Sequence, residues 1–138
     1  MKIPFDVTDR LIRLPVYLRG PRGEHRFQFA LDTAATRSAA SGLVLELLGY
    51  HQSQAVGQHQ VRAGSGGVRV GLLSVARLTA FGRTELNFPL QWLPLPPATM
   101  LDGLLGLDFF RGHVLEIDFV RGYVELDPER KPWWRFWR

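Results

Sequence analysis

Apolar and polar residues alternate over long stretches of this chain, which is the period-two pattern of half-buried β-strands. Residues 12–18 read IRLPVYL and residues 26–31 read RFQFAL, with an apolar side chain at every second position. The segment GPRGE at 20–24 lies between them and is rich in turn-forming residues, so the two strands are predicted to form a hairpin. Two more hairpins are predicted, with turns near Gly82 and at Arg121-Gly122.

Helical patterning is scarce. Residues 39–48 are predicted to form a helix that Ser38 or Ser41 caps, with an apolar face made of Leu43, Leu47 and Leu48. A second, short helix is predicted near Asp108, which we interpret as its structural N-cap. Because strands dominate, the predicted fold class is all-β: a small closed barrel with one or two short helices.

Length and composition define one globular domain. The chain has 138 residues, of which 46% are hydrophobic and 22% charged. It contains no cysteine, which excludes a disulfide scaffold, a thiolate metal site and a cysteine nucleophile. No apolar run of about 18 residues and no signal-peptide pattern occur, so a cytoplasmic protein is expected. We assign residues 1–127 to the domain and 128–138 to a C-terminal tail.

Two stretches carry candidate chemistry. In FALDTAATRSA at 29–39, an apolar strand leads directly to Asp32, and small residues follow. A carboxylate is costly to bury alone, so Asp32 either caps a turn at the strand end or performs a reaction. The second stretch, DGLLGLDFF at 102–110, holds a pair of bulky aliphatic residues before a glycine.

A glycine-rich hairpin is predicted between these two stretches. In VRAGSGGVRVGLL at 61–73, two strand-like arms flank Gly64, Ser65, Gly66 and Gly67. Such a tip adopts positive φ angles easily, and it forms either an ordinary hairpin loop or a flap that covers a substrate.

In order and spacing, these segments resemble the retroviral-type (retropepsin-like) single-domain aspartic proteases and their bacterial relatives, over residues 11–126. The resemblance implies a closed barrel, Asp32 as the catalytic residue, and a flap at Gly64, Ser65, Gly66 and Gly67. It also implies a catalytic loop completed by Thr33, Ala34, Ala35 and Thr36. Leu104, Leu105 and Gly106 would support this loop from behind. The family uses no cofactor, and none is expected here.

The resemblance also implies the reaction and the assembly. Aspartic proteases hydrolyse peptide bonds with two carboxylates that share one proton. The chain has one Asp-Thr loop, and Asp102 lacks a hydroxyl neighbour, so the second carboxylate is expected from Asp32 of another copy. We therefore predict a homodimeric aspartic endopeptidase that acts on a peptide or protein substrate. Residues 1–7 and 123–126 are the candidates for the dimer sheet.

Ala34 departs from the family pattern, which has glycine at this position. If its φ is positive, alanine adds about 1–2 kcal/mol of strain. If φ is negative, the methyl group crowds the substrate or the other loop instead. The alternative interpretation is therefore a weak or inactive protease-fold dimer that serves as a peptide-binding or assembly module.

The remaining candidates are a tail and four histidines. The histidines show no metal-type spacing, and no metal site is predicted. In the tail, basic residues alternate with four large aromatics, Trp133, Trp134, Phe136 and Trp137. These aromatics either pack on the domain or its dimer partner, or dock on another protein or a membrane surface. We predict that the tail docks on another protein or, as the second choice, on a membrane surface. Docking on a membrane would make the protein peripheral to it. Nucleic acid is the least favoured partner, because the net charge of +4 is modest and concentrated at this end.

Overall fold

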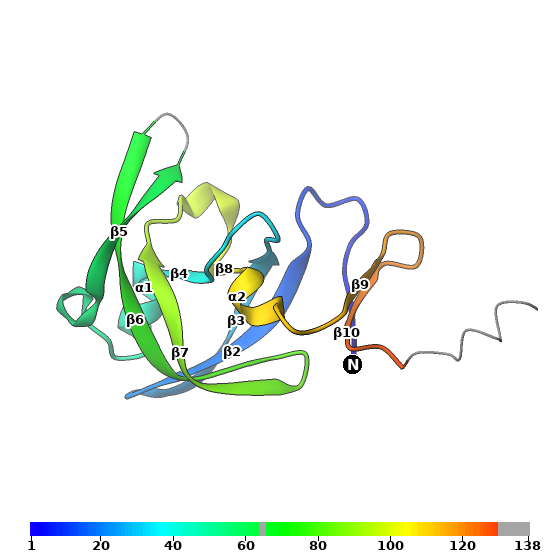
Figure 1. Cartoon of the computed structure of the whole chain (residues 1–138), viewed down its shortest axis with the longest axis horizontal. Helices are drawn as coiled ribbons and strands as arrows, with labels where there is room; N and C mark the ends of the chain where they lie inside the picture. The colour runs from blue at the N-terminus through cyan, green and yellow to red at the C-terminus, as the bar shows by residue number, and fades with distance from the viewer. Residues whose placement is uncertain (64–65, 130–138) are drawn as a thin grey trace, which may run out of the picture.

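The structure, a computed structural model, describes residues 1–63 and 66–129, and the side chains of residues 1–57 and 70–129. The elements follow one another as β1 (Lys2–Pro4), β2 (Arg13–Gly20), β3 (Gly23–Leu31), β4 (Ala39–Ser41), α1 (Gly42–Leu47), η1 (Gln52–Gln54), β5 (Val56–Ala63), β6 (Gly66–Ala80), β7 (Arg83–Leu93), η2 (Pro97–Thr99), β8 (Gly103–Leu105), α2 (Leu107–Phe110), β9 (Leu115–Asp118) and β10 (Tyr123–Leu126). Figure 1 shows a barrel of strands with a smaller sheet beside it.

Six strands close into a barrel, which confirms the predicted fold class. Their order is β2-β3-β8-β4-β7-β6, and pairing of β2 with β6 closes the ring; β5 pairs with β6 outside it. The alternating apolar residues of the sequence fill the interior, since Leu14, Val16 and Leu18 of β2 are almost completely buried. β8 runs parallel to β3 and brings Leu105 beside Leu31.

The predicted hairpins form where turn residues occur. β2 and β3 pair from Arg13–Ala30 to Gly20–Gly23. β6 and β7 meet at Phe81-Gly82, both of which have positive φ angles. β9 and β10 are joined by a turn in which Gly122 has a φ of 75°.

The predicted helix at 39–48 is wrong at its start and in its buried face. Residues 39–41 form β4, which pairs with β7 and β8, and α1 begins after the N-cap Ser41. Leu43 and Leu47 are exposed, at 80% and 52%, whereas Leu48 is buried with Val44 and Leu45. Small residues at 39–41 let this short strand fit between its two neighbours, and the helix packs on the core through Val44 and Leu45 instead of Leu43 and Leu47.

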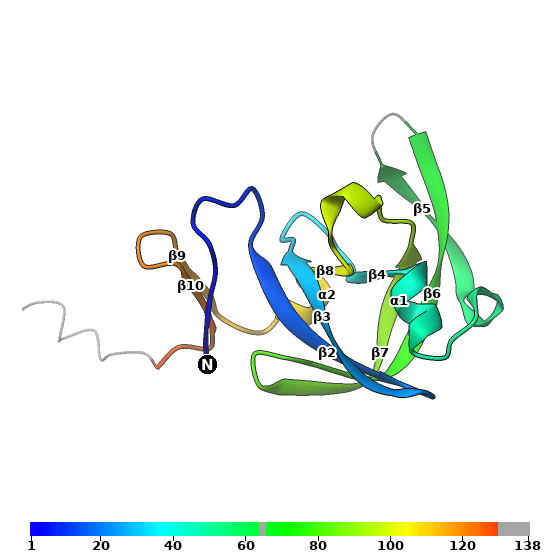
Figure 2. The same ribbon diagram turned by 180° about the vertical axis from the view of Figure 1, so that it is seen from behind.

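The first strand and the last two described strands form a separate three-stranded sheet in the order β1-β10-β9. β1 pairs antiparallel with β10, with Ile3 opposite Val124. Figure 2 shows this sheet beside the barrel, on the side of β2. The terminal segments predicted to contribute to a dimer sheet therefore pair with each other within one chain.

Aspartates support the C-terminal hairpin of this sheet. Amide hydrogen bonds from Arg121 and Val120 hold the pKa of Asp118 below its ordinary value, with the Arg121 bond as the larger cause. The His113 ring lies 2.6 Å from Asp127 and, together with the Val114 amide, lowers the pKa of that carboxyl group. In the part of the chain that the structure describes, no helix is long and apolar enough to cross a membrane.

Candidate active site

Asp32 follows the last residue of β3 and lies at the edge of the barrel. Its amide donates to the carbonyl of Leu105 on the neighbouring β8 at 2.9 Å. Its side-chain Oδ1 accepts the Ala34 amide at 3.0 Å, and its carbonyl accepts the Ala35 amide at 3.2 Å. The aspartate therefore folds the loop around itself as an Asx turn. Oδ2 has no hydrogen-bond partner among the described residues.

The loop after Asp32 rests on the start of α2. The first amides of a helix have no partner inside the helix, so they are free to bind other groups. Here the Leu107 amide donates to the carbonyl of Ala35 at 2.9 Å, and the Asp108 amide donates to that of Thr36 at 3.2 Å. The predicted catalytic loop and the predicted support at 104–106 are thus adjacent in the structure.

Ala34 has no unfavourable backbone conformation. It is not among the residues with a positive φ, and its side chain is exposed. The sequence left open whether the φ of Ala34 is positive or negative; the structure has no positive φ there, so alanine adds no left-handed strain. Any effect of the alanine must therefore come from its methyl group, which is exposed.

The predicted flap falls partly within the described residues. Gly66 and Gly67 begin β6 and pair with Ala63 and Arg62 of β5. Gly64 and Ser65 lie outside the described residues. In Figure 1 the β5–β6 hairpin extends beyond the barrel on the same side as the loop that joins β3 to β4. The hairpin predicted between the two chemical stretches is present, and its covering role stays a prediction.

Two other aspartates near this end of the barrel bind backbone amides. Asp102 accepts the amide of Gln28 in β3 at 2.8 Å. Asp108 was interpreted as the N-cap of α2, but Gly106 holds that position and Asp108 lies in the first turn. Its carboxylate instead accepts the amide and the hydroxyl of Ser38, at 2.9 and 2.6 Å. Asp108 is therefore held by Ser38 and not by an N-cap bond to α2.

A small apolar cluster borders the loop on the side facing away from the barrel core. Ala39 and Leu104 pair across β4 and β8, while their neighbours Ala40 and Leu105 face the core. The cluster consists of Ala39, Val70, Leu93, Leu95 and Leu104. Among the described residues, no group of three or more histidine and carboxylate side chains lies close enough to hold a metal ion.

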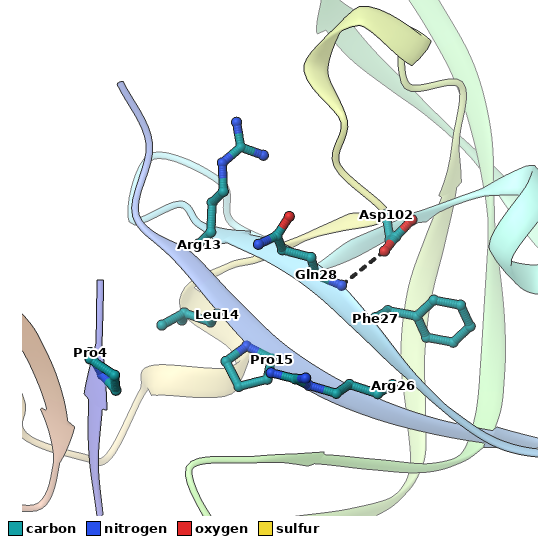
Figure 3. Close-up of a pocket in the computed structure, with 8 residues that line it drawn as sticks. All are labelled: Pro4, Arg13, Leu14, Pro15, Arg26, Phe27, Gln28 and Asp102. Atoms are coloured by element: carbon teal, nitrogen blue, oxygen red, sulfur yellow. Dashed lines mark hydrogen bonds between the residues drawn. The ribbon is translucent and has the colours of Figure 1, made fainter. Parts of the chain in front are cut away.

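A pocket of about 400 Å³ lies elsewhere, on the outer face of the β2–β3 hairpin. Figure 3 shows Pro15 and Arg26 in it, with Pro4 of the terminal sheet opposite and the Asp102–Gln28 hydrogen bond at its edge. None of its lining residues belongs to the loop at 32–38. We therefore place the candidate site at Asp32 and not at this pocket.

A closed barrel with an Asp-Thr loop supported by a Leu-Leu-Gly strand defines a protein of the single-domain aspartic protease class. A family model described as aspartyl protease matches residues 14–109, and the chain belongs to this family. The fold is similar to that of a retropepsin-like aspartic protease from Rickettsia conorii, with a TM-score of 0.69 and 14% identity over 91% of this chain and 89% of that one.

The retroviral protease-like domain of Ddi1 from Leishmania major is also similar, with a TM-score of 0.54 and 16% identity over 91% of this chain and 98% of that one. A comparison with curated proteins found no significant match. The resemblance to retropepsin-like proteases that the sequence suggested is confirmed at the level of family and fold.

Proposed function

We propose that the protein is an aspartic endopeptidase that acts as a homodimer, with Asp32 of each subunit in one shared site. The observation that carries this proposal is the state of the Asp32 carboxylate. The backbone of Asp32 is held by Leu105 and one carboxylate oxygen by Ala34, while Oδ2 has no partner among the described residues. This is the arrangement expected of a group that is positioned by the fold and reserved for a substrate or water.

The need for a second subunit follows from the neighbouring acids. Peptide hydrolysis of this kind needs two carboxylates. Both oxygens of Asp108 already bind Ser38, and Asp102 has neither the hydroxyl neighbour nor the loop of small residues that follows Asp32. A second copy related by a two-fold axis supplies an equivalent Asp32, because a two-fold interface brings the same surface of both subunits together.

Two close carboxylates cannot both ionise cheaply, so the pair holds one proton. The ionised Asp32 takes a proton from a water molecule while the water oxygen attacks the carbonyl carbon of the substrate. The protonated Asp32 of the other subunit donates its proton to the carbonyl oxygen. The C–N bond of the tetrahedral intermediate then breaks. The leaving amine takes the proton that the first Asp32 removed from water, and the second Asp32 takes a proton from a hydroxyl group of the intermediate, so that the pair again holds one proton. The Thr33 side chain is exposed at the loop, and its hydroxyl is proposed to donate a hydrogen bond to the same loop of the other subunit.

Substrate recognition is proposed to involve two surfaces beside Asp32. The β5–β6 hairpin covers the bound peptide, and the apolar cluster containing Ala39 and Leu104 contacts apolar side chains next to the bond that is cleaved. Partly buried leucines at this cluster favour a peptide with apolar residues there, because contact removes apolar surface from water.

The experiment is a matched pair of isosteric variants assayed on a peptide library at acidic and neutral pH. Asp32→Asn should abolish cleavage while sedimentation shows an unchanged dimer. Asp102→Asn, in which the amide oxygen still accepts from Gln28, should cleave like the unchanged protein. Cleavage should also yield to statine-type inhibitors, since these mimic the tetrahedral intermediate. Normal cleavage by the Asp32→Asn variant would refute the assignment.

One observation favours a second candidate, a protease-fold dimer that binds peptides without cleaving them efficiently. The exposed methyl of Ala34 lies one residue from Thr33 in the loop, where the family pattern has glycine. This candidate predicts peptide binding that survives the Asp32→Asn change, together with negligible turnover by the unchanged protein.

A further inference from the structure

Ser38 is the one fully buried polar side chain in the part of the chain that the structure describes. It stands at the end of the loop that begins with Asp32, directly before β4. A buried hydroxyl is costly unless its hydrogen bonds are made. Its contacts therefore show what it stabilises.

The Ser38 hydroxyl connects two groups. It donates to Oδ1 of Asp108 at 2.6 Å and accepts the amide of Gly106 at 2.9 Å. The Ser38 amide adds two more contacts to the same carboxylate, at 2.9 Å to Oδ1 and 3.0 Å to Oδ2. Since a carboxylate only accepts, the direction of every bond is defined: Gly106 donates to Ser38, and Ser38 donates to Asp108.

The Gly106 amide belongs to the same peptide group as the Leu105 carbonyl. That carbonyl accepts the amide of Asp32 at 2.9 Å. In a planar trans peptide the N–H and C=O groups point in opposite directions, so one rotation moves both. Ser38 and Asp108 hold one end of this peptide group, and Asp32 is attached to the other end.

We propose that Ser38 and Asp108 are positioning residues, which set the orientation of the Leu105–Gly106 peptide group and through it the position of the Asp32 carboxylate. This inference rests on the proposed function for its kinetic consequence. It assigns to Asp108 and Ser38 a role in the reaction without contact with the substrate, carried by a charged group in the first turn of a helix of four residues.

The test compares Ser38→Ala and Asp108→Ala in the full chain. Each should lower the hydrogen-exchange protection of the Asp32 and Gly106 amides by about tenfold or more, while amides of β6 and β7 keep theirs, because the opening is local. Each should also lower kcat by about 10- to 100-fold with KM nearly unchanged, since small displacements of catalytic groups reduce rate more than binding. Asp108→Asn keeps an oxygen for the Ser38 amide and should restore part of both losses.

Asp9→Ala is the control. Asp9 also accepts one backbone amide and one side-chain donor, from Leu11 at 3.1 Å and from Arg13 at 2.8 Å, but in an exposed loop outside the candidate dimer segments. It should leave the exchange of the Asp32 amide and kcat unchanged.

Unchanged protection of the Asp32 and Gly106 amides in both alanine variants would overturn the proposal. So would an equal loss of protection across the whole barrel in every variant, Asp108→Asn included. If the unchanged protein shows no Asp32-dependent cleavage, the proposed function fails, and the exchange measurements still decide this inference.

Discussion

Gly106 offers the sharpest test of how tightly the loop of Asp32 is packed against its support. A Cβ atom at this position would lie 2.7 Å from the Ala35 oxygen, 3.0 Å from the Arg37 carbonyl carbon and 3.1 Å from the Arg37 oxygen. These are backbone atoms, so no flexible side chain can turn away. The φ of Gly106 is −105°, and the obstacle to a side chain is therefore space and not backbone strain.

The magnitude of the Gly106→Ala effect follows from the displacement. The Ala35 oxygen must move from 2.7 Å to an ordinary contact at 3.4 Å, a shift of about 0.7 Å. Overpacking of this kind costs about 1–3 kcal/mol of stability. A misplacement near 1 Å reduces rate by about 100-fold, so we expect kcat to fall by roughly 10- to 100-fold. The assay is steady-state peptide cleavage together with thermal unfolding.

Gly20→Ala is the matched control for this variant. A Cβ there would lie 2.6 Å from the Leu48 oxygen and 2.7 Å from a ring carbon of Tyr50, at the opposite end of β3 from Asp32. It should lower the melting temperature to a similar extent and leave kcat nearly unchanged. Unchanged kcat and melting temperature for Gly106→Ala would refute the reasoning, and so would an equal loss of kcat in the control.

Three further predictions concern the loop, the terminal sheet and the tail. Ala34→Gly should raise kcat several-fold if the methyl group crowds the site, as measured by peptide turnover; no change would mean that alanine is tolerated and would weaken the case for an inactive module. Because the pKa values of Asp118 and Asp127 are lowered in the folded state, their contribution to stability is present above the ordinary value of 3.8 and is lost as the pH falls below it. Amide exchange in β9 and β10 should therefore accelerate below about pH 4 before that of the barrel, and simultaneous opening of both sheets would contradict this. Deletion of residues 131–138 should leave the barrel folded and dimeric but weaken binding to a protein partner or to lipid vesicles, since the last strand among the described residues ends at Leu126. Unfolding or monomers would place the tail in the core or the dimer contact.

The barrel could be predicted from the sequence because its strands and turns are specified by local patterns. An apolar residue at every second position specifies which face of a strand is buried, and Gly-rich turns specify where the chain reverses. The position of Asp32 at the end of such a strand followed from the same pattern. The short β4 was missed because residues 39–41 pair with β7 and β8, which are distant in sequence, and nothing local distinguishes AAS from the start of a helix.

Partners across long sequence distances were decided only by the tertiary structure. Asp108 has the sequence features of a helix N-cap, yet its carboxylate binds Ser38, 70 positions earlier, because the parallel pairing of β3 with β8 brings α2 against the Asp32 loop. The pairing of β1 with β10 likewise joins segments that are more than a hundred residues apart in the sequence. Sequence periodicity determines which side of a strand is buried; which strands become neighbours depends on how the whole sheet closes.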